Sequence, residues 1–301
     1  MDNNTTKRKY SVEELKKYKK RSMWAEVWRN FKKNRTAMVG LFIVIALIII
    51  AVFSHFYYDY AADIVHQEVK DRFQKPNAEH WFGTDNFGRD IFTRIMYGTK
   101  YSLSVGIVAV AISCAIGTTL GVIAGFYGGI TENIILRVCE VFVGIPSVLL
   151  GIAIMAAFGQ SIVVLMFAIG LVYVPMYCRT TRAAVLPVRG EEYIEAARIA
   201  GVGDFGIMFK HILPNSLSPI IVQITMGVAS GILTASSLSF LGLGVPLPSP
   251  EWGAMLSEGR GYIRDYGYLT IFPGLAIMIT VLAFNLMGDG LRDALDPKLK
   301  Q

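Results

Sequence analysis

Charged residues are scarce in this chain. Asp, Glu, Lys and Arg make up 17% of its 301 residues, whereas an average soluble domain has about 25%. Hydrophobic residues account for 53%, and the mean hydropathy is +0.46, which excludes a disordered chain and argues against an ordinary soluble enzyme. Several apolar runs reach about 20 residues, the length that crosses the hydrocarbon core of a bilayer. The composition therefore predicts an integral membrane protein.

Cysteine is equally rare, and the motifs of common catalytic sites are missing. Cys114, Cys139 and Cys178 lie in or beside apolar runs and form neither a disulfide framework nor a CxxC pattern, so we expect small, membrane-buried side chains. The chain has no GxxxxGK[ST] phosphate loop, no HExxH pair and no GxSxG elbow. We therefore expect no catalytic residue, no metal site and no cofactor in this chain.

Charge is also missing from the middle of the apolar runs. Charged residues such as Glu132, Arg137, Glu140 and Asp289 sit at the edges of these runs. A charge at the bilayer centre costs about 2.5–3.5 kcal/mol on insertion scales, and ion-driven carriers keep such groups for their function. This absence argues against a stand-alone carrier or channel, and it indicates that the energy for any transport enters elsewhere than in these spans.

Positive charge is concentrated near the start of the chain. The net charge is +6, and 12 of the 29 Lys and Arg residues lie within residues 1–36. No basic stripe is interleaved with aromatic residues, so we expect no nucleic-acid partner. A basic segment directly before an apolar run is typical of a cytoplasmic end.

Six apolar segments predict an all-α fold, a polytopic membrane bundle of six transmembrane helices. They cover residues 37–56, 102–126, 133–157, 160–178, 218–240 and 268–288. Polar segments 57–100 and 241–267 are predicted as external loops and 179–216 as a cytoplasmic loop. With this topology the cytoplasmic segments hold 21 Lys and Arg and the external segments 8. The count predicts that both termini are cytoplasmic, with residues 1–36 as a tail and 37–301 as the transmembrane domain.

Within the tail, an aromatic face predicts an amphipathic helix. Trp24, Val27, Trp28 and Phe31 recur at helical spacing, and charged residues occupy the other faces. We expect this helix to lie in the headgroup region of the lipid. The alternative is a solvated helix that packs on a partner.

Glycines are placed for close packing between helices. Lipid offers no hydrophobic drive for helices to associate, so small residues that let backbones approach are favoured at their interfaces. Glycines spaced four apart follow the second span and its exit, and another such pair lies in the fifth span: Gly117, Gly121, Gly125, Gly129, Gly227 and Gly231. We expect tight helix–helix seams at these positions.

The cytoplasmic loop predicts two short helices joined by a turn. Residues 191–200 are rich in helix formers, and Gly201 suits the left-handed conformation that ends a helix. We expect Asp204 to cap the next helix and Pro214 to disfavour helix at the residue before it. Four apolar residues are available for burial: Ile207, Met208, Ile212 and Leu213. The loop is either a structural connector or a docking element for a soluble partner.

This loop also carries a resemblance to a known family. Glu195-Ala196-Ala197, Gly201 and Leu213-Pro214 match the spacing of the EAA loop in permease subunits of bacterial ABC importers. His211 stands where the general pattern has Ile, but residues 211–215 (HILPN) are similar to the form in the oligopeptide, dipeptide and nickel branch. Other segments resemble the same branch: residues 83–90 (GTDNFGRD), 239–244, 272–274 and 285–297.

The resemblance implies a type I ABC importer permease fold and the second, C-type, permease subunit of a complex in a prokaryotic cell membrane. The implied partners are a second permease subunit, two ATPase subunits that bind the ATP, and an external solute-binding protein, besides membrane lipid. It implies import of dipeptides or oligopeptides. The alternative is import of nickel or another chelated metal. A membrane scaffold without transport is less favoured than either kind of import.

For the loop, the resemblance implies coupling to the ATPase subunits. Glu195 would hold the loop by hydrogen bonds or an ion pair, with Arg198 as one candidate partner. Ala196 and Ala197 would allow close approach, and Gly201 would set the angle between the two helices. The implied coupling set also contains Asp204, His211, Leu213 and Pro214, of which His211 is expected to be structural.

The GTDNFGRD stretch before the second span allows two roles. It contains Gly83, Thr84, Asp85, Gly88, Arg89 and Asp90. Its charged residues form either a gate or binding-protein contact, or an ion-paired cap that holds the loop before the span, and their local spacing favours the cap. In the second external loop, we expect Trp252 to lie at the membrane interface.

Overall fold

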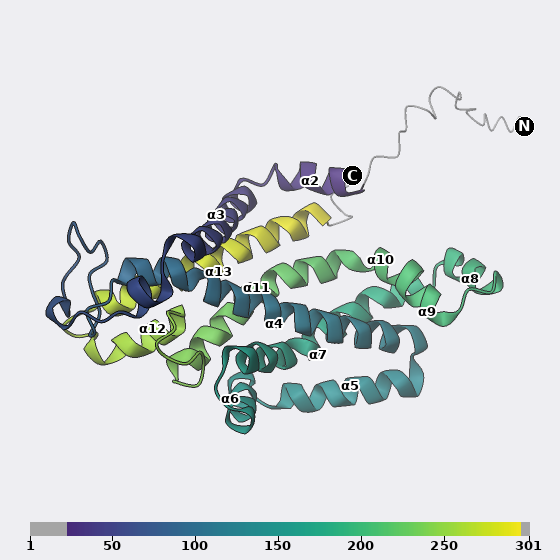
Figure 1. Ribbon diagram of the computed structural model, residues 1–301. Coiled ribbons are helices and arrows are strands. Elements are labelled where there is room, and N and C mark those ends of the chain that lie inside the picture. The colour runs from purple at the N-terminus through teal and green to yellow at the C-terminus, as the bar shows by residue number, and fades with distance from the viewer. Residues whose placement is uncertain (1–22, 296–301) are drawn as a thin grey trace, which may run out of the picture.

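The computed structural model describes residues 23–295, and its regular elements in that range are helices, with one isolated bridge between Thr84 and Asp90 (Figure 1). Most of the predicted basic tail, and Asp296 and Pro297 at the far end, lie outside the described residues. The α-helices are α2 Met23–Phe31, α3 Arg35–Tyr57, α4 Ile91–Tyr127, α5 Gly129–Gly144, α6 Ser147–Phe158, α7 Ile162–Arg189, α8 Glu192–Ile199, α9 Asp204–Gly206, α10 Leu213–Asn215, α11 Leu217–Phe240, α12 Trp252–Gly259 and α13 Tyr268–Leu295. Two π-helical turns, η1 Tyr60–Val65 and η3 Ile207–Ile212, and two 3-10 turns, η2 Val69–Asp71 and η4 Arg260–Tyr262, complete the set.

Five helices in the described range are long and apolar enough to cross a membrane: α3, α4, α7, α11 and α13. A sixth crossing exists only as the pair α5 and α6, which meet at an angle of 90°. The third span, predicted as one segment over residues 133–157, is therefore a bent pair. Ile145 has an extended backbone (φ −96°, ψ 126°), because the ring of Pro146 disfavours helical geometry at the preceding residue.

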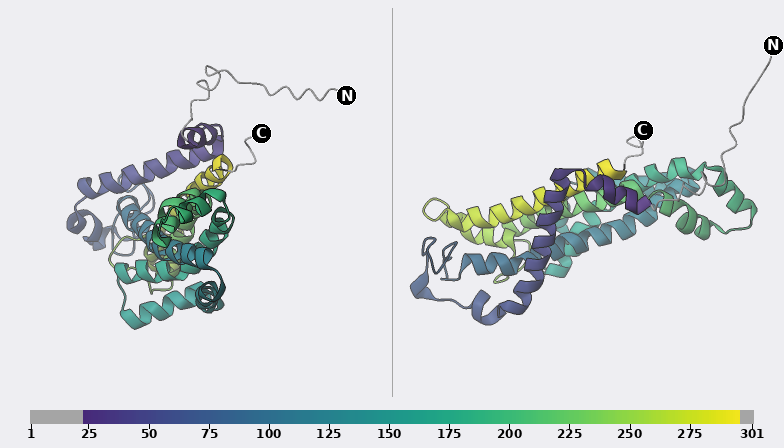
Figure 2. Two further views of the ribbon diagram at one scale, coloured as in Figure 1. Left: turned by 90° about the vertical axis from the view of Figure 1, so that its right-hand side faces the viewer. Right: turned by 90° about the horizontal axis from the view of Figure 1, so that it is seen from above.

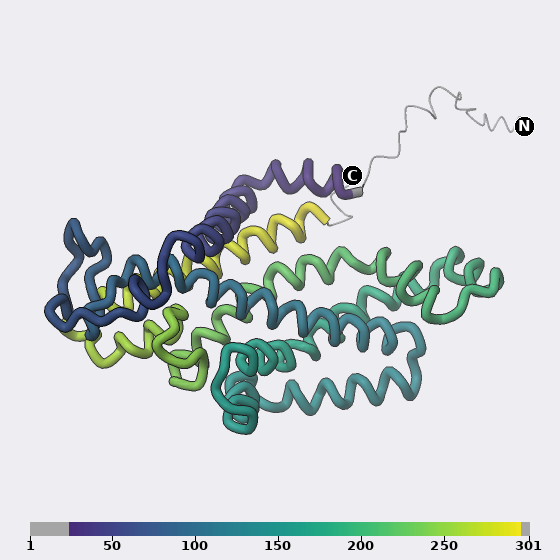
Figure 3. The backbone as a smooth tube through the Cα atoms, in the orientation of Figure 1, coloured from purple at the N-terminus to yellow at the C-terminus, as the bar shows by residue number. Residues whose placement is uncertain are grey.

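The helix α4 forms the centre of the bundle and begins earlier than predicted. Asp90 is its N-cap and accepts a hydrogen bond from the Thr93 amide, so the helix starts at Ile91 rather than near residue 102. Its 37 residues extend over about 55 Å. It packs against α3, α5, α7 and α11, and Figure 3 shows it running along most of the length of the bundle.

Three of the predicted glycines pack α4 against α7. A Cβ atom on Gly117, Gly121 or Gly125 would lie 2.5–2.7 Å from atoms of α7, so a larger residue would push the helices apart. Gly129 does not join this seam: it begins α5, has a φ of +55°, and faces open space. In the fifth span, Gly227 lies against Tyr177 of α7, and Gly231 lies against the backbone of α4.

The two ends of the bundle carry different elements (Figures 1 and 2). The short helices α8, α9 and α10 lie at one end, toward which α2 and the last turn of α13 also point; we call it the α8 end. The segment 58–90 and α12 lie at the opposite end, the α12 end. The predicted loop 241–267 therefore contains a helix, and α7 continues 11 residues into the predicted loop 179–216.

The predicted amphipathic helix is α2, which has one buried face and one exposed face. Val27 and Phe31 are buried against Ala37 and Ala294, whereas Trp24 and Trp28 are about half exposed. The helix thus packs on the end of α13 with one face and turns its indole rings outward.

Candidate functional site

The segment after α7 folds as a helix, a turn and a second helical stretch that project beyond the bundle (Figure 1). α8 ends at Ile199, and Gly201 has a φ of +83°. The Gly201 amide donates to the Arg198 carbonyl at 3.0 Å, and the Val202 amide donates to the Ala197 carbonyl at 3.1 Å. These are the paired bonds of a Schellman motif. Gly201 therefore sets the direction in which the chain leaves α8.

One side of this segment is buried against the bundle. Its apolar side chains contact α4 and α7 in a single cluster that contains Ile194, Ile207, Met208, Ile212, Val122, Phe126 and Val185. Leu213 is only partly buried at its edge. The buried cluster fixes the segment to the ends of both long helices.

Polar contacts tie the same segment to the end of α4. Arg189 donates from Nη1 to the carbonyl oxygens of Gly125 (3.0 Å) and Phe126 (3.1 Å), which satisfies acceptors that a helix end leaves unpaired. The Tyr127 hydroxyl donates to Asp204 Oδ2 at 3.1 Å. The capping role predicted for Asp204 is wrong, because Gly203 is the N-cap of α9 and no side chain caps it. Asp204 is instead the first helical residue and contacts α4.

The other side of the segment is exposed. Glu195, Ala196 and Arg198 are exposed and Ala197 is half-buried. Arg198 lies over the ring of Phe126, 5.8 Å from its centre. No ion pair joins Arg198 to Glu195 within the described residues, so the candidate pairing for Glu195 is not present. The Glu195 carboxylate is left facing outward.

Two apolar side chains extend this exposed surface. Ile199 is 86% exposed and Phe205 is 73% exposed, and they flank the turn at Gly201. Exposed apolar side chains that form a patch mark protein contacts more often than isolated ones do. We call the surface of Glu195, Ala196, Ile199 and Phe205 the docking surface.

The segment returns to the bundle through a π-helical turn. His211 is half-buried in η3, and its carbonyl accepts a hydrogen bond from Asn215 Nδ2 at 2.7 Å. Leu213 is helical (φ −56°, ψ −45°), so the expected interruption before Pro214 does not occur. A wider π turn accommodates the missing proline N–H, and Pro214 lies in the first turn of α10, where that donor is not needed.

At the α12 end, the GTDNFGRD stretch forms a compact turn that begins α4. Gly83 and Gly88 have φ values of +79° and +82°. Thr84 is fully buried, and its carbonyl accepts from the Tyr268 hydroxyl at 3.1 Å. The bridge between Thr84 and Asp90 closes the turn.

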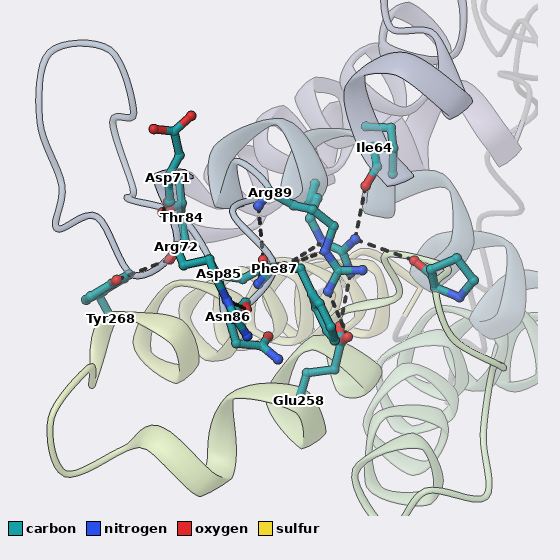
Figure 4. Close-up of polar contacts among 12 residues, drawn as sticks. Ile64, Asp71, Arg72, Thr84, Asp85, Asn86, Phe87, Arg89, Glu258 and Tyr268 are labelled. Carbon is teal, nitrogen blue, oxygen red and sulfur yellow. Dashed lines mark hydrogen bonds and ion pairs between the residues drawn. The ribbon is translucent and has the colours of Figure 1, made fainter. Parts of the chain in front are cut away.

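A buried network of four charged side chains joins this turn to α12 (Figure 4). Arg89 donates from Nε to Asp85 Oδ2 at 2.6 Å and from Nη2 to Glu258 Oε1 at 2.8 Å. Arg94 donates from Nη2 to Glu258 Oε2 at 3.0 Å, and its Nε lies 3.8 Å from Asp85. Arg89 and Arg94 are 3% and 1% exposed. Two cations and two carboxylates balance, so the charges compensate one another where water is excluded.

Arg94 also holds the loop segments on either side of the network. Its Nη1 donates to the Ile64 carbonyl at 3.1 Å and to the Pro248 carbonyl at 3.5 Å. Arg94 therefore links η1, the loop before α12 and the first turn of α4. We call Asp85, Arg89, Arg94 and Glu258 the charge network.

The expected local ion-paired cap is present as the Asp85–Arg89 pair, and further pairs extend it outside the stretch. Asp90 pairs with His80, Oδ2 to Nδ1 at 2.9 Å, and caps α4, whereas Arg89 pairs with Asp85 and Glu258. Trp252 does not lie at a membrane interface: it is 1% exposed, and its Nε1 donates to the Ile95 carbonyl at 3.1 Å. It packs as the first residue of α12 in the protein core.

The sequence did not point to Glu258 or Arg94 as members of this site. Glu258 lies 169 positions from Arg89 and 164 from Arg94, and no spacing rule connects residues so far apart. Glu258 is one of three acidic residues in the predicted loop 241–267, with Glu251 and Asp265, so its charge alone did not single it out.

Comparison with known proteins agrees with this architecture. Residues 117–301 match the family model described as binding-protein-dependent transport system inner membrane component. Residues 22–76 match the model described as the N-terminal TM domain of oligopeptide transport permease C.

Three relatives cover nearly the whole chain. It is 49% identical to the dipeptide transport system permease protein DppC of Alkalihalophilus pseudofirmus over 93% of this chain and 91% of that one. It is 45% identical to the glutathione transport system permease protein GsiD of Pectobacterium atrosepticum, over 93% of each chain. It is 43% identical to DppC of Haemophilus influenzae, over 92% of this chain and 95% of that one.

A solved structure shares the fold. A chain of the MetNI methionine ABC transporter, in an inward-facing conformation, superposes with a TM-score of 0.53 at 18% identity, covering 65% of this chain and 93% of that chain. The expected fold class, a polytopic helical permease, is confirmed. The chain is a multi-pass membrane protein and a transport component, and it belongs to the inner-membrane components of binding-protein-dependent transport systems, in their oligopeptide and dipeptide permease branch.

Proposed function

We propose that this chain is one of two permease subunits of an importer that carries dipeptides or other short peptides. Relatives at 43–49% identity are named as dipeptide and glutathione permeases, and glutathione is itself a small peptide. These names favour a peptide over nickel as the solute. The other members of the assembly are a second permease subunit, two ATPase subunits and a solute-binding protein outside the membrane.

The observation that carries the proposal is the docking surface. It presents Ile199 and Phe205 to solvent on a segment that projects beyond the bundle. Apolar anchors with a charged neighbour, here Glu195, are the composition of a protein–protein contact. An ATPase subunit that covers this surface would bind ATP itself, so this chain needs no cofactor of its own.

The mechanism follows from how the docking surface is attached. Force applied at Phe205 reaches α4 through Tyr127 and through the cluster around Phe126. Because α4 is one helix of 37 residues, displacement of its end at α8 moves its beginning at Asp90. Closure of the ATPase subunits would thereby change the packing at the α12 end, where the solute-binding protein delivers the peptide.

The same proposal sets the orientation in the membrane. The α8 end would be cytoplasmic, with both chain termini on that side, and the α12 end would face outward. The 12 Lys and Arg residues within residues 1–36, directly before the first apolar span in the sequence, support this.

The test is co-purification combined with uptake. Phe205→Asp places a charge in the docking surface, and we expect loss of the ATPase subunits from the purified complex and loss of ATP-driven dipeptide uptake into proteoliposomes. Trp81→Asp, at an exposed aromatic residue of the α12 end, is the control and should retain the ATPase. An unchanged ATPase content in Phe205→Asp would reject the docking assignment. Uptake of nickel ions but not dipeptide by the intact complex would reject the peptide assignment.

A further inference from the structure

We infer that the seam between α7 and α11, on the side turned away from α4, is this chain's wall of the solute path. The inference rests on the proposed function, because it assigns the surface along which the peptide would move. It names residues of this chain that line the path.

Polar side chains follow this seam along the membrane-spanning part of α7 and α11. The Tyr173 hydroxyl lies 2.8 Å from Thr234 Oγ1 and donates to the Ser230 carbonyl at 3.3 Å. Gln223 lies beside Met176 at 3.3 Å. On α11 the positions 223, 230, 234 and 237 recur at intervals of seven, four and three, so they share one face of the helix.

The hydroxyl groups of Ser230 and Ser237 can still accept hydrogen bonds from molecules outside the bundle. Ser230 Oγ donates to the Met226 carbonyl at 3.3 Å, and Ser237 Oγ donates to the Leu233 carbonyl at 2.8 Å. Each hydroxyl oxygen retains lone pairs that accept hydrogen bonds. In lipid that capacity would be unused, whereas in a hydrated path it would be satisfied by water or by the peptide backbone.

The outward faces of other spans are different. Between residues 37 and 54 the exposed residues of α3 are apolar, among them Phe42, Ile49 and Phe53, and those of α13 include Leu275, Met278 and Leu282. Such faces are suited to lipid. On α5 an exposed ion pair, Arg137 to Glu140 at 2.9 Å, interrupts the apolar surface, but its two charges satisfy each other.

A cavity opens at the α8 end of the seam, and another lies at the α12 end of α11. The cavity at the α12 end, of about 340 Å³, is lined by Gln160, Ser239, Ser257 and Glu258 among others and includes none of the seam residues named above. At the α8 end, a cavity of about 390 Å³ is lined by Thr180, Gln223 and Arg292 among others. Gln223 belongs to both the seam and the second cavity, so the polar surface is continuous with it.

The chemistry of the seam suits a solute with variable side chains. Its hydroxyl and amide groups carry no fixed charge, and Met176 and Leu233 lie between them as exposed apolar surface. Neutral hydrogen-bonding groups contact a peptide backbone in any register. They hold it weakly enough to release it, as conduction requires. A zwitterionic peptide in water is therefore the occupant we assign to this surface.

The experiment measures the access of water to single cysteines in the assembled complex. Ser230→Cys and Ser237→Cys place thiols in the seam, and Leu282→Cys, an exposed position of α13, places one on the apolar face. A charged, membrane-impermeant methanethiosulfonate reagent is applied, and labelling is counted above that of the unmutated complex with its three native cysteines. The thiolate is the form of cysteine that reacts, and few thiols ionise in apolar surroundings. We therefore expect the two seam thiols to react at least about tenfold faster than the thiol at position 282. Their modification should also block dipeptide uptake.

The outcomes separate the two proposals. Equal labelling of all three cysteines in complexes that still import dipeptide would overturn the seam assignment and leave the proposed function intact. If Ser230→Cys alone disrupts assembly, Ser237→Cys decides by the same comparison. A complex without substitutions that imports no peptide would instead reject the proposed function.

Discussion

Arg89 and Glu258 are 169 residues apart in the chain, yet Arg89 Nη2 lies 2.8 Å from Glu258 Oε1. The contact joins the turn before α4 to α12, and Arg94 binds the second oxygen of the same carboxylate at 3.0 Å. One glutamate thus holds two buried arginines. The beginning of α4 and the helix α12 are therefore held together as one unit at this end of the bundle.

Removing one member of the charge network should destabilise the protein strongly. Arg89→Gln leaves Glu258 and Asp85 with less compensation in a buried site, and we expect a loss of about 3–5 kcal/mol in the free energy of unfolding. The thermal unfolding midpoint of the purified complex in detergent measures it. Arg264→Gln, an exposed arginine of the same loop region, is the control and should leave the midpoint unchanged. A small effect of Arg89→Gln would show that the network does not hold α12.

Gly201→Val should uncouple ATP hydrolysis from uptake while the chain still inserts into the membrane. The φ of +83° at Gly201 is unfavourable for a β-branched residue, so the angle between α8 and α9 should change. Gly203→Val is a matched control, since Gly203 also faces open space but has a φ of −67°. The readout is the number of ATP molecules hydrolysed per peptide imported. The coupling role of the turn would be refuted if both variants keep the wild-type ratio.

Gly121→Ala should loosen the seam between α4 and α7. A Cβ atom there would lie 2.5 Å from the Cys178 carbonyl oxygen and 2.7 Å from Thr181 Cβ, and overpacking of this kind costs about 1–3 kcal/mol. Gly144→Ala serves as the comparison, because a Cβ at Gly144 meets no atom within 4 Å. Thermal midpoints of the two variants should differ, with Gly121→Ala the lower. Equal midpoints would mean that α4 and α7 can separate at little cost.

The contact between Tyr127 and Asp204 should be measurable as a coupling energy. Tyr127→Phe and Asp204→Asn each weaken the 3.1 Å hydrogen bond, and the double variant should lose little more than either alone. Because the pair is exposed to water, we expect the coupling to be small but measurable. Hydrogen exchange of the amides in α9 and η3 gives the local opening free energies for the cycle. Additive losses in the cycle would indicate that the hydrogen bond does not restrain α9.

Local features of this protein could be read from its sequence with good accuracy. Gly201 ends α8 as expected, because the left-handed conformation is a property of one residue and its neighbours. The break at Ile145 was missed, because residues 133–157 were predicted as one span, although the cause is local: Pro146 restricts the residue before it. The 90° angle between α5 and α6 is not a local property. The prediction that Asp204 caps the helix was wrong because capping depends on which residue begins the helix. The helix begins one position earlier than predicted, so Gly203 is the N-cap.

The sequence by itself determined that this chain crosses the membrane, and where, because in lipid every backbone N–H and C=O must bond within its own segment. That requirement selects apolar helices, and hydropathy along the chain shows them. Only the tertiary structure decided that Glu258 reaches Arg89 and Arg94, and that Tyr173 of α7 meets Thr234 of α11. These contacts depend on how whole helices pack, and packing brings together side chains whose separation along the chain follows no period.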